Sequence, residues 1–213
     1  MTDSEPARRV LILFAHPALE KSRVNRRLAA AVADLPGVAL HDLYEAYPDF
    51  DVDVKREQDL LAAHDVLVVQ HPFYWYSTPA LVKQWEDLVL EHGWAYGTGG
   101  TALRGKRWLS AVTTGGRETA YAAGGTNRFT MRQLLAPLDQ TAHLCGMIFL
   151  PPFVVHGTHR LTEQEIAAAA EQYRAVVEAL RDDRLDLDAA RGVDRLNADL
   201  TRVLRPAGAS HGR

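Results

Sequence analysis

The chain of 213 residues contains one cysteine, Cys145, so it cannot form a disulfide within itself. Its first residues, M-T-D-S-E-P, lack the basic start and the long apolar stretch of a secretion signal. We therefore expect a reducing, cytoplasmic location. The flanking sequence of Cys145 is apolar, which predicts a buried structural thiol.

Long apolar runs and an excess of positive charge are also missing. The first apolar run, residues 10–15, is far shorter than the roughly 20 residues that span a bilayer. The 24 Lys and Arg residues face 27 Asp and Glu residues, a net charge of −3. No basic field exists to hold a nucleic-acid backbone, so we expect no nucleic-acid partner. Hydrophobic residues at 47% and charged residues at 24% are typical of a soluble globular chain of about one domain.

Two glycine-rich phosphate motifs are absent as well. The sequence has no G-x-x-x-x-G-K-[ST], which disfavours a nucleoside triphosphatase, and no G-x-G-x-x-G after its first predicted strand, which disfavours a dinucleotide-binding domain. His156 and His159 are spaced H-G-T-H, but no third ligand lies nearby in the sequence, so we expect no metal site.

What the sequence does have is a regular alternation of strand and helix patterns. This alternation predicts an α/β fold with a doubly wound, five-stranded parallel sheet, helices on both faces and a ligand crevice at the carboxyl ends of the strands. We expect this domain over residues 1–181 and a partly helical, partly frayed extension over 182–213. The predicted strands are 10–15, 38–43, 65–70, 108–113 and one within 147–155, and the predicted helices begin near Ser22, Lys55, Pro79, Thr130 and Thr162.

The loop after the first strand, H-P-A-L-E-K-S-R-V-N, leads into a helix N-terminus, where unpaired N–H groups favour an anion. Lys21 and Arg23 add positive charge, and Ser22 and Asn25 add neutral donors. A monophosphate ligand fits this pattern, and an ordinary helix cap on a basic surface turn is the alternative.

Two further loops follow buried strands. Four consecutive aromatic residues, 73–76, come directly after the third strand, so they either line a pocket for a planar ligand or contact another subunit. After the fourth strand, T-T-G-G at 113–116 permits a close approach of the backbone to a ligand, although a tight turn has the same sequence.

Together, several motifs resemble the flavodoxin-like NAD(P)H:quinone oxidoreductases, and are most similar to the ancillary subunits of glutathione-regulated potassium-efflux antiporters. The likeness covers about residues 9–181. The motifs are H-P-A-L-E-K-S-R-V-N, Q-H-P-F-Y-W-Y-S-T-P, E-H-G-W-A-Y-G-T-G-G-T-A-L-R-G-K, V-T-T-G-G and C-G-M-I-F-L-P-P-F-V-V-H.

The resemblance implies a flavodoxin-like fold with FMN bound in the predicted crevice. The FMN phosphate and ribityl chain would be held by His16, Ser22, Arg23, Val24 and Asn25. The flavin ring would be wrapped by Pro72, Phe73, Tyr74 and Trp75. The other edge of the ring would be contacted by Thr113, Thr114, Gly115 and Gly116.

In mammalian-type members of this family, a tyrosine and a histidine after T-T-G-G assist catalysis. Tyr121 falls at the tyrosine position, and we predict a catalytic role for it, a tyrosine on a loop tip being the alternative. At the histidine position the chain has Asn127, which can form a hydrogen bond but cannot donate a proton as an imidazolium does.

The resemblance thus implies an FMN-dependent, two-electron reduction of quinones by NAD(P)H, with ping-pong hydride transfer, in a homodimer. The alternative is a regulatory ancillary subunit that docks on and activates a potassium-efflux antiporter at the inner face of the membrane. The extension over 182–213 could serve docking, dimer packing or neither.

Overall fold

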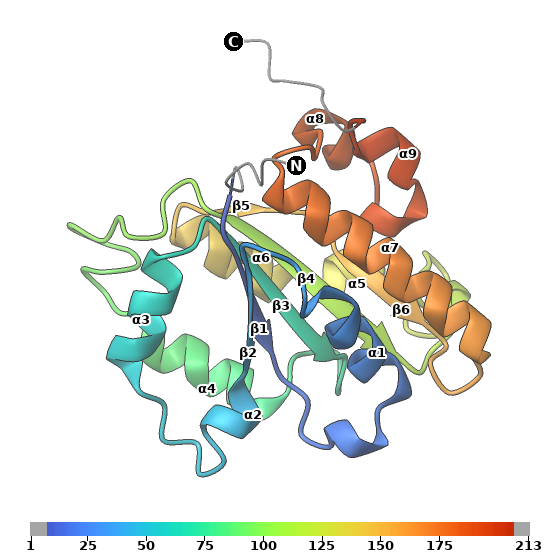
Figure 1. Cartoon of the computed structure of the whole chain (residues 1–213), viewed down its shortest axis with the longest axis horizontal. Coiled ribbons are helices and arrows are strands. Elements are labelled where there is room, and N and C mark those ends of the chain that lie inside the picture. The colour runs from blue at the N-terminus through green and yellow to red at the C-terminus, as the bar shows by residue number, and fades with distance from the viewer. Residues whose placement is uncertain (1–7, 207–213) are drawn as a thin grey trace.

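The computed structural model describes residues 8–206, and its centre is a parallel β-sheet (Figure 1). The strands follow the order β2-β1-β3-β4-β5, with β6 also paired to β4, and every pairing is parallel. The predicted doubly wound sheet is therefore confirmed. The strands are β1 (Val10–Phe14), β2 (Val38–Asp42), β3 (Val66–Pro72), β4 (Arg107–Thr114), β5 (Ile148–Phe149) and β6 (Phe153–His156).

The fifth predicted strand is broken into two pieces that occupy one position in the sheet. β5 pairs with the first two residues of β4, and β6 pairs with its last four. Between them lie Pro151 and Pro152, which have no N–H group to contribute to the sheet. The break therefore follows from the proline pair.

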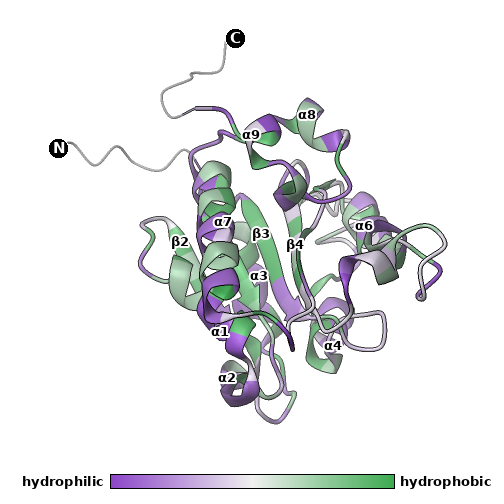
Figure 2. Ribbon diagram, turned by 90° about the vertical axis from the view of Figure 1, so that its right-hand side faces the viewer, coloured by the Kyte–Doolittle hydropathy of each residue, from purple (hydrophilic) through white to green (hydrophobic). Residues whose placement is uncertain are grey.

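Helices cover both faces of the sheet, as Figure 2 shows from the side. Alternate residues of β1 explain why, because Val10 and Ile12 join one core cluster and Leu11 and Leu13 join the other. Among residues 8–206, no helix is long and apolar enough to cross a membrane. One face carries α1 (Arg23–Val32) and α7 (Glu163–Arg181), and the other carries α3 (Val54–Ala62), α4 (Ala80–Val89), α5 (Met131–Leu134) and α6 (Ala136–Leu144).

Several helix boundaries follow from capping residues. Ser22 caps α1 by accepting a hydrogen bond from the Asn25 N–H at 3.1 Å, and Thr162 caps α7 in a capping box with Glu165. The helix predicted from Thr130 is instead two helices, because α5 ends at Leu134 and α6 begins at Ala136, with Pro137 in its first turn. The short helix α2 (Leu43–Ala46), capped by the Asp42 side chain, was not predicted.

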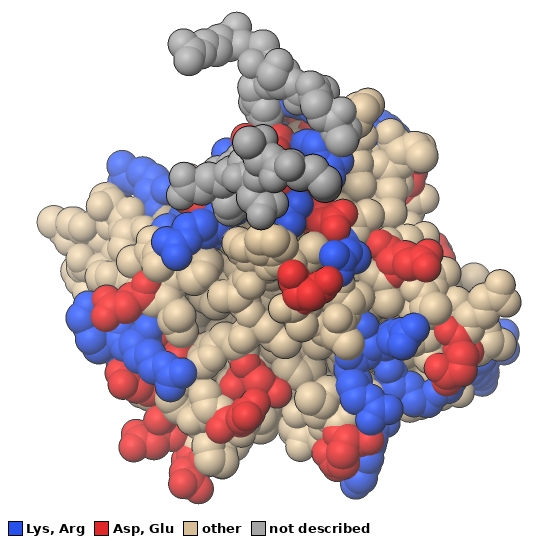
Figure 3. All heavy atoms as spheres, viewed as in Figure 1, with Lys and Arg blue, Asp and Glu red and all other residues tan. Residues whose placement is uncertain are grey.

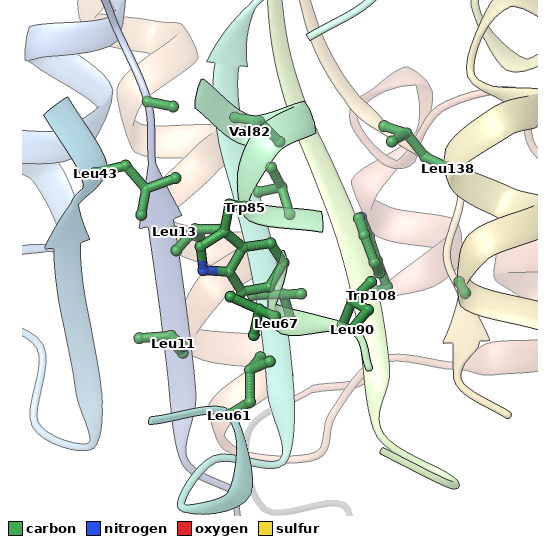
Figure 4. Close-up of a cluster of buried hydrophobic side chains, with 14 of the residues drawn as sticks. Leu11, Leu13, Leu43, Leu61, Leu67, Val82, Trp85, Leu90, Trp108 and Leu138 are labelled. Carbon is green, nitrogen blue, oxygen red and sulfur yellow. The ribbon is translucent and has the colours of Figure 1, made fainter. Parts of the chain in front are cut away.

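A fully buried carboxylate lies between α3 and α4. Glu57 accepts hydrogen bonds from the Tyr47 hydroxyl at 2.5 Å and the Trp85 indole at 2.9 Å, and its Oε1 lies 2.8 Å from His41 Nε2. Burial favours the protonated acid, but these three partners outweigh it and lower the pKa of Glu57. Figure 4 shows Trp85 among the leucine side chains of this cluster. The carboxylate therefore ties β2, α3 and α4 together within an apolar core.

Residues 182–206 of the extension pack onto the body of the protein. They form α8 (Leu187–Arg191), the one-turn helix η3 (Leu196–Ala198) and α9 (Leu200–Val203). Leu196 and Val203 are fully buried in the same core cluster as α1 and α7. The division of the chain at residue 181 stays a prediction.

Candidate functional site

A cavity of about 370 Å³ lies at the carboxyl ends of β1, β3 and β4, where a doubly wound sheet places its ligands. Of the predicted cofactor residues, Trp75, Thr114 and Gly116 do not line it. Its lining consists of His16, Ala18, Lys21, Ser22, Arg23, Val24, Asn25, Pro72, Phe73, Tyr74, Thr113, Gly115, Thr158 and His159. The structure thus brings most of the predicted residues to one place.

Asn25 fixes the start of α1 against the sheet. It is 2% exposed, and its Nδ2 donates to Thr113 Oγ1 at 2.7 Å. Its backbone carbonyl accepts from Gln70 Nε2 at 3.1 Å, so the helix is tied to both β3 and β4. Among the described residues, the buried Oδ1 of Asn25 has no hydrogen-bond partner. This acceptor is therefore available to a hydroxyl or amide group in the cavity.

His16 follows β1 and is held as a neutral imidazole. Its Nδ1 accepts a hydrogen bond from the Ala18 N–H at 3.1 Å, which leaves the ring proton on Nε2. Burial lowers the pKa of His16, and the nearby carboxylates of Glu20 and Asp42 offset only part of this effect. His16 can therefore offer a neutral N–H donor to a ligand.

Positive charge gathers over α1 and the loop before it, as Figure 3 shows. Lys21 and Arg23 both line the cavity. The Arg23 guanidinium also forms an ion pair with Glu163, at the start of α7, with an Nη2–Oε1 distance of 2.5 Å. Together with the N-terminus of α1, these cations make this end of the cavity suited to an anion.

The aromatic loop after β3 makes a tight turn. Tyr74 and Ser77 exchange two backbone hydrogen bonds of 3.1 and 2.9 Å, and the two residues between them, Trp75 and Tyr76, have φ angles of 48° and 64°. This left-handed backbone is unusual for bulky residues. Phe73 and Tyr74 line the cavity, whereas Trp75 is 93% exposed at the tip.

The two glycines of T-T-G-G permit close packing by side chains of the chain itself. A Cβ atom at Gly115 would lie 2.7 Å from the His159 ring, and one at Gly116 would lie 2.8 Å from the Tyr121 ring. Larger residues at these positions would displace both rings. Gly115 and His159 both line the cavity, so Gly115 helps to set the shape of this wall.

Tyr121 and Asn127 are not among the residues that line the cavity, although the Tyr121 ring centroid lies 6.2 Å from that of Phe73, which does line it. The Tyr121 hydroxyl is 2.6 Å from Thr114 Oγ1, and its ring centroid is 5.4 Å from that of His156. Asn127 Oδ1 accepts a hydrogen bond of 3.3 Å from the hydroxyl of Tyr76 in the aromatic turn. The roles predicted for Tyr121 and Asn127 stay predictions.

Thr158 and His159 were missed as site residues by the sequence reasoning. They follow β6, so they lie at the carboxyl end of the fifth strand position and line the cavity. The topology could have indicated them, because every loop at that edge of a parallel sheet faces the same crevice. In the sequence, the H-G-T-H spacing suggested only a metal site, which was not expected.

A second cavity, of about 320 Å³, lies between α4 and α6 and holds none of the predicted site residues. Glu86 lines it and is 8% exposed, and its Oε1 has no partner within residues 8–206. Burial raises the pKa of Glu86 to about 7. Cys145 also lines this cavity and is buried, as predicted.

The strand order and a crevice at the β1–β3 switch point define a flavodoxin-like protein. A family model described as "flavodoxin-like fold" matches residues 8–177, and the chain belongs to this family. The uncharacterized NAD(P)H oxidoreductase YdeQ of Bacillus subtilis is 46% identical over 165 residues, which are 78% of this chain and 84% of that protein. The glutathione-regulated potassium-efflux system ancillary protein KefG of Pectobacterium atrosepticum is 46% identical over 170 residues, 80% of this chain and 92% of that protein.

Solved structures agree with this assignment. General stress protein 14 of Treponema denticola, in complex with FMN, has a TM-score of 0.78 and 39% identity, covering 81% of this chain and 99% of that one. An NADPH-quinone reductase from P. pentosaceus has a TM-score of 0.73 and 33% identity, covering 79% and 96%. The resemblance predicted from the motifs is confirmed.

Proposed function

We propose that the chain is an FMN-dependent oxidoreductase that transfers two electrons from NAD(P)H to a quinone. In the overall reaction, NAD(P)H, a proton and the quinone give NAD(P)⁺ and the hydroquinone. The names of the relatives, an NAD(P)H oxidoreductase and an NADPH-quinone reductase, support the predicted enzyme class. The observation that carries the proposal is the cavity, which joins the N-terminus of α1 to an aromatic wall.

The described residues fit FMN at the phosphate end. A dianionic phosphate suits the N-terminus of α1, with Lys21 and Arg23 as cations and His16 Nε2 as a neutral donor. The unpartnered Oδ1 of Asn25 suits a ribityl hydroxyl, which would satisfy its missing hydrogen bond. Ser22 and Val24 would contribute at the same helix turn.

The other end of the cavity fits a planar ring. Pro72, Phe73 and Tyr74 would bind one side of the isoalloxazine, and Thr113 and Gly115 the other. The proposal keeps the predicted contacts of Trp75 with the flavin ring and of Thr114 and Gly116 with its other edge. Thr114 would also act through its hydrogen bond with Tyr121. When bound, FMN would supply an acceptor and donor for hydride.

The residues beside the ring would handle the proton. Tyr121, held by Thr114, presents a hydroxyl that can donate a hydrogen bond to the quinone oxygen as negative charge develops there. Asn127 would hold the aromatic turn through Tyr76. Because one cavity would serve both substrates, NAD(P)⁺ has to leave before the quinone enters, which is ping-pong kinetics.

An anaerobic titration tests this proposal. FMN-loaded protein is mixed with NADPH and then with a quinone, while the flavin absorbance is followed. We expect direct bleaching to the two-electron state and recovery with the quinone. The variant Asn25→Ala should bind FMN more weakly, whereas the exposed Glu171→Gln should not. Protein that does not bind FMN, or that binds it but is not reduced, contradicts the proposal.

The likeness to the potassium-efflux ancillary protein supports a second candidate function. In this second function, a cytoplasmic homodimer of the chain docks on a potassium-efflux antiporter at the inner face of the membrane and activates the antiporter. Potassium efflux from cells that carry the antiporter, measured with and without this chain, tests it. Equal efflux in both strains, with active quinone reduction, argues for the enzyme alone.

A further inference from the structure

The C-terminal extension is bonded to the outer edge of the sheet next to the candidate site. Asn197 Oδ1 accepts from the Val154 N–H at 3.0 Å, and Asn197 Nδ2 donates to the Val154 carbonyl at 2.9 Å. The Leu196 N–H also donates to the Pro152 carbonyl at 2.9 Å. The amide of Asn197 thereby takes the place of a neighbouring strand along β6.

The same segment reaches the loop that carries Tyr121. Arg195 Nη1 lies 2.5 Å from Glu118 Oε1, and the Arg195 side chain is only 23% exposed. Glu118 is the first residue of the one-turn helix η2 (Glu118–Tyr121), and Tyr121 is its last. The hydrogen bond from Arg195 lowers the pKa of Glu118, so this carboxylate stays charged and paired at neutral pH.

Tyr121 packs against the strand that the extension holds. Its ring lies beside His156, the last residue of β6, two positions after Val154. Burial lowers the pKa of His156 to about 4, so an uncharged ring supports Tyr121 at neutral pH. The Tyr121 ring also lies near Phe73, with 6.2 Å between ring centroids. The extension therefore holds both the helix turn beneath Tyr121 and the strand beside it.

We propose that Arg195 and Asn197 are positioning residues that hold Tyr121 at the candidate site, so that the extension is part of the catalytic apparatus. This inference rests on the function proposed above for Tyr121. We call the contacts of Arg195 with Glu118 and of Asn197 with Val154 the clamp. The family model ends at residue 177, so Arg195 and Asn197 lie outside the segment that the model matches. The clamp gives the extension a role distinct from docking to a partner.

The first experiment measures the clamp without using catalysis. Amide hydrogen exchange is recorded on the full chain, with and without FMN, for peptides that cover residues 117–129. Because a partly exposed ion pair contributes about 1 kcal/mol or less, we expect Arg195→Ala to speed exchange there by about threefold to fivefold. Arg191→Ala, which removes the exposed pair with Asp188 in the same extension, is the matched control. Equal exchange in the wild type and Arg195→Ala, or an equal effect of the control, overturns the inference.

The second experiment asks whether the clamp acts through Tyr121. The rate at which a quinone reoxidises the reduced flavin, the step proposed for Tyr121, is measured for Arg195→Ala, Tyr121→Phe and the double variant. We expect Arg195→Ala to lower the rate of the wild type by about threefold to tenfold. Introduced into Tyr121→Phe, the same substitution should lower the rate by less than about twofold, because the effects of coupled residues are not additive. Arg195→Lys should recover part of the rate.

Additive effects, or a Tyr121→Phe variant as fast as the wild type, overturn the inference. Failure of the proposed function is distinguishable, because wild-type protein would then show no flavin reduction at all. In that case the exchange measurement still decides whether Arg195 holds the Tyr121 loop.

Discussion

The buried carboxylate of Glu57 offers the sharpest test of how the fold is stabilised. In Glu57→Gln, an NH₂ group replaces one carboxylate oxygen. Placed at Oε2, it faces the Trp85 N–H, and placed at Oε1, it faces Tyr47 and His41. Either orientation leaves at least one buried donor without an acceptor. Since hydrogen bonds to a charged group are worth about 1.5–3 kcal/mol each, we expect a loss of about 3 kcal/mol in the free energy of unfolding at pH 7.

Urea unfolding, followed by circular dichroism, measures this loss. With a slope of about 3 kcal/mol per M for a chain of this size, the midpoint should fall by roughly 1 M. Glu171→Gln, on the exposed face of α7, should leave the midpoint unchanged. A fall of less than about 0.3 M for Glu57→Gln would refute the reasoning.

The pH dependence provides an independent check of the same carboxylate. The pKa of Glu57 is lower in the folded protein than its ordinary value of 4.5. Its contribution is therefore fully present above about pH 4.5 and is lost as the pH falls through the folded pKa. The difference in stability between wild type and Glu57→Gln should shrink below pH 4.5, and a constant difference down to pH 3 contradicts the assignment.

Three further predictions concern the two cavities. Because the pKa of Glu86 is raised to about 7, the folded protein binds more protons than the unfolded chain between about pH 4.5 and 7, and wild-type stability falls across this window. In thermal unfolding, Glu86→Gln should be about 2 kcal/mol more stable than the wild type at pH 8 and nearly as stable as the wild type at pH 5. Glu163→Gln frees Arg23 from its ion pair, so FMN affinity by fluorescence titration should rise about twofold to threefold, and an unchanged affinity argues against a phosphate contact. Gly115→Ala should push the His159 ring aside and weaken FMN binding, measured by the same titration, by about tenfold. Circular dichroism should show that this variant is still folded.

Much of the fold could be predicted because its elements have strong local signals. The apolar run at β1 and the capping residues Ser22 and Thr162 mark a buried strand and two helix starts without any tertiary information. The break between β5 and β6 was less visible, since a single apolar segment spans both. Its two prolines were the available signal.

The site could be predicted only in part, because side-chain direction depends on tertiary contacts. The loop after β1 lies where its motif indicated, but the sequence does not reveal that Trp75 faces solvent while Phe73 and Tyr74 line the cavity. The bond between Tyr121 and Thr114 joins residues seven apart through a turn that has no regular pattern. The pairing of Arg195 with Glu118 spans 77 positions and leaves no local trace in the sequence.

The exposed position of Trp75 makes the rim of the cavity visible to spectroscopy. Trp85 and Trp108 are fully buried and Trp94 is partly buried, so Trp75 is the most exposed of the four tryptophans. Trp75 is 93% exposed, and its emission is expected at the longer wavelength of an indole in water. The red edge of the intrinsic fluorescence therefore reports on one turn, the Tyr74–Ser77 turn, and its loss or shift would record a ligand or a second subunit covering that turn without any added label.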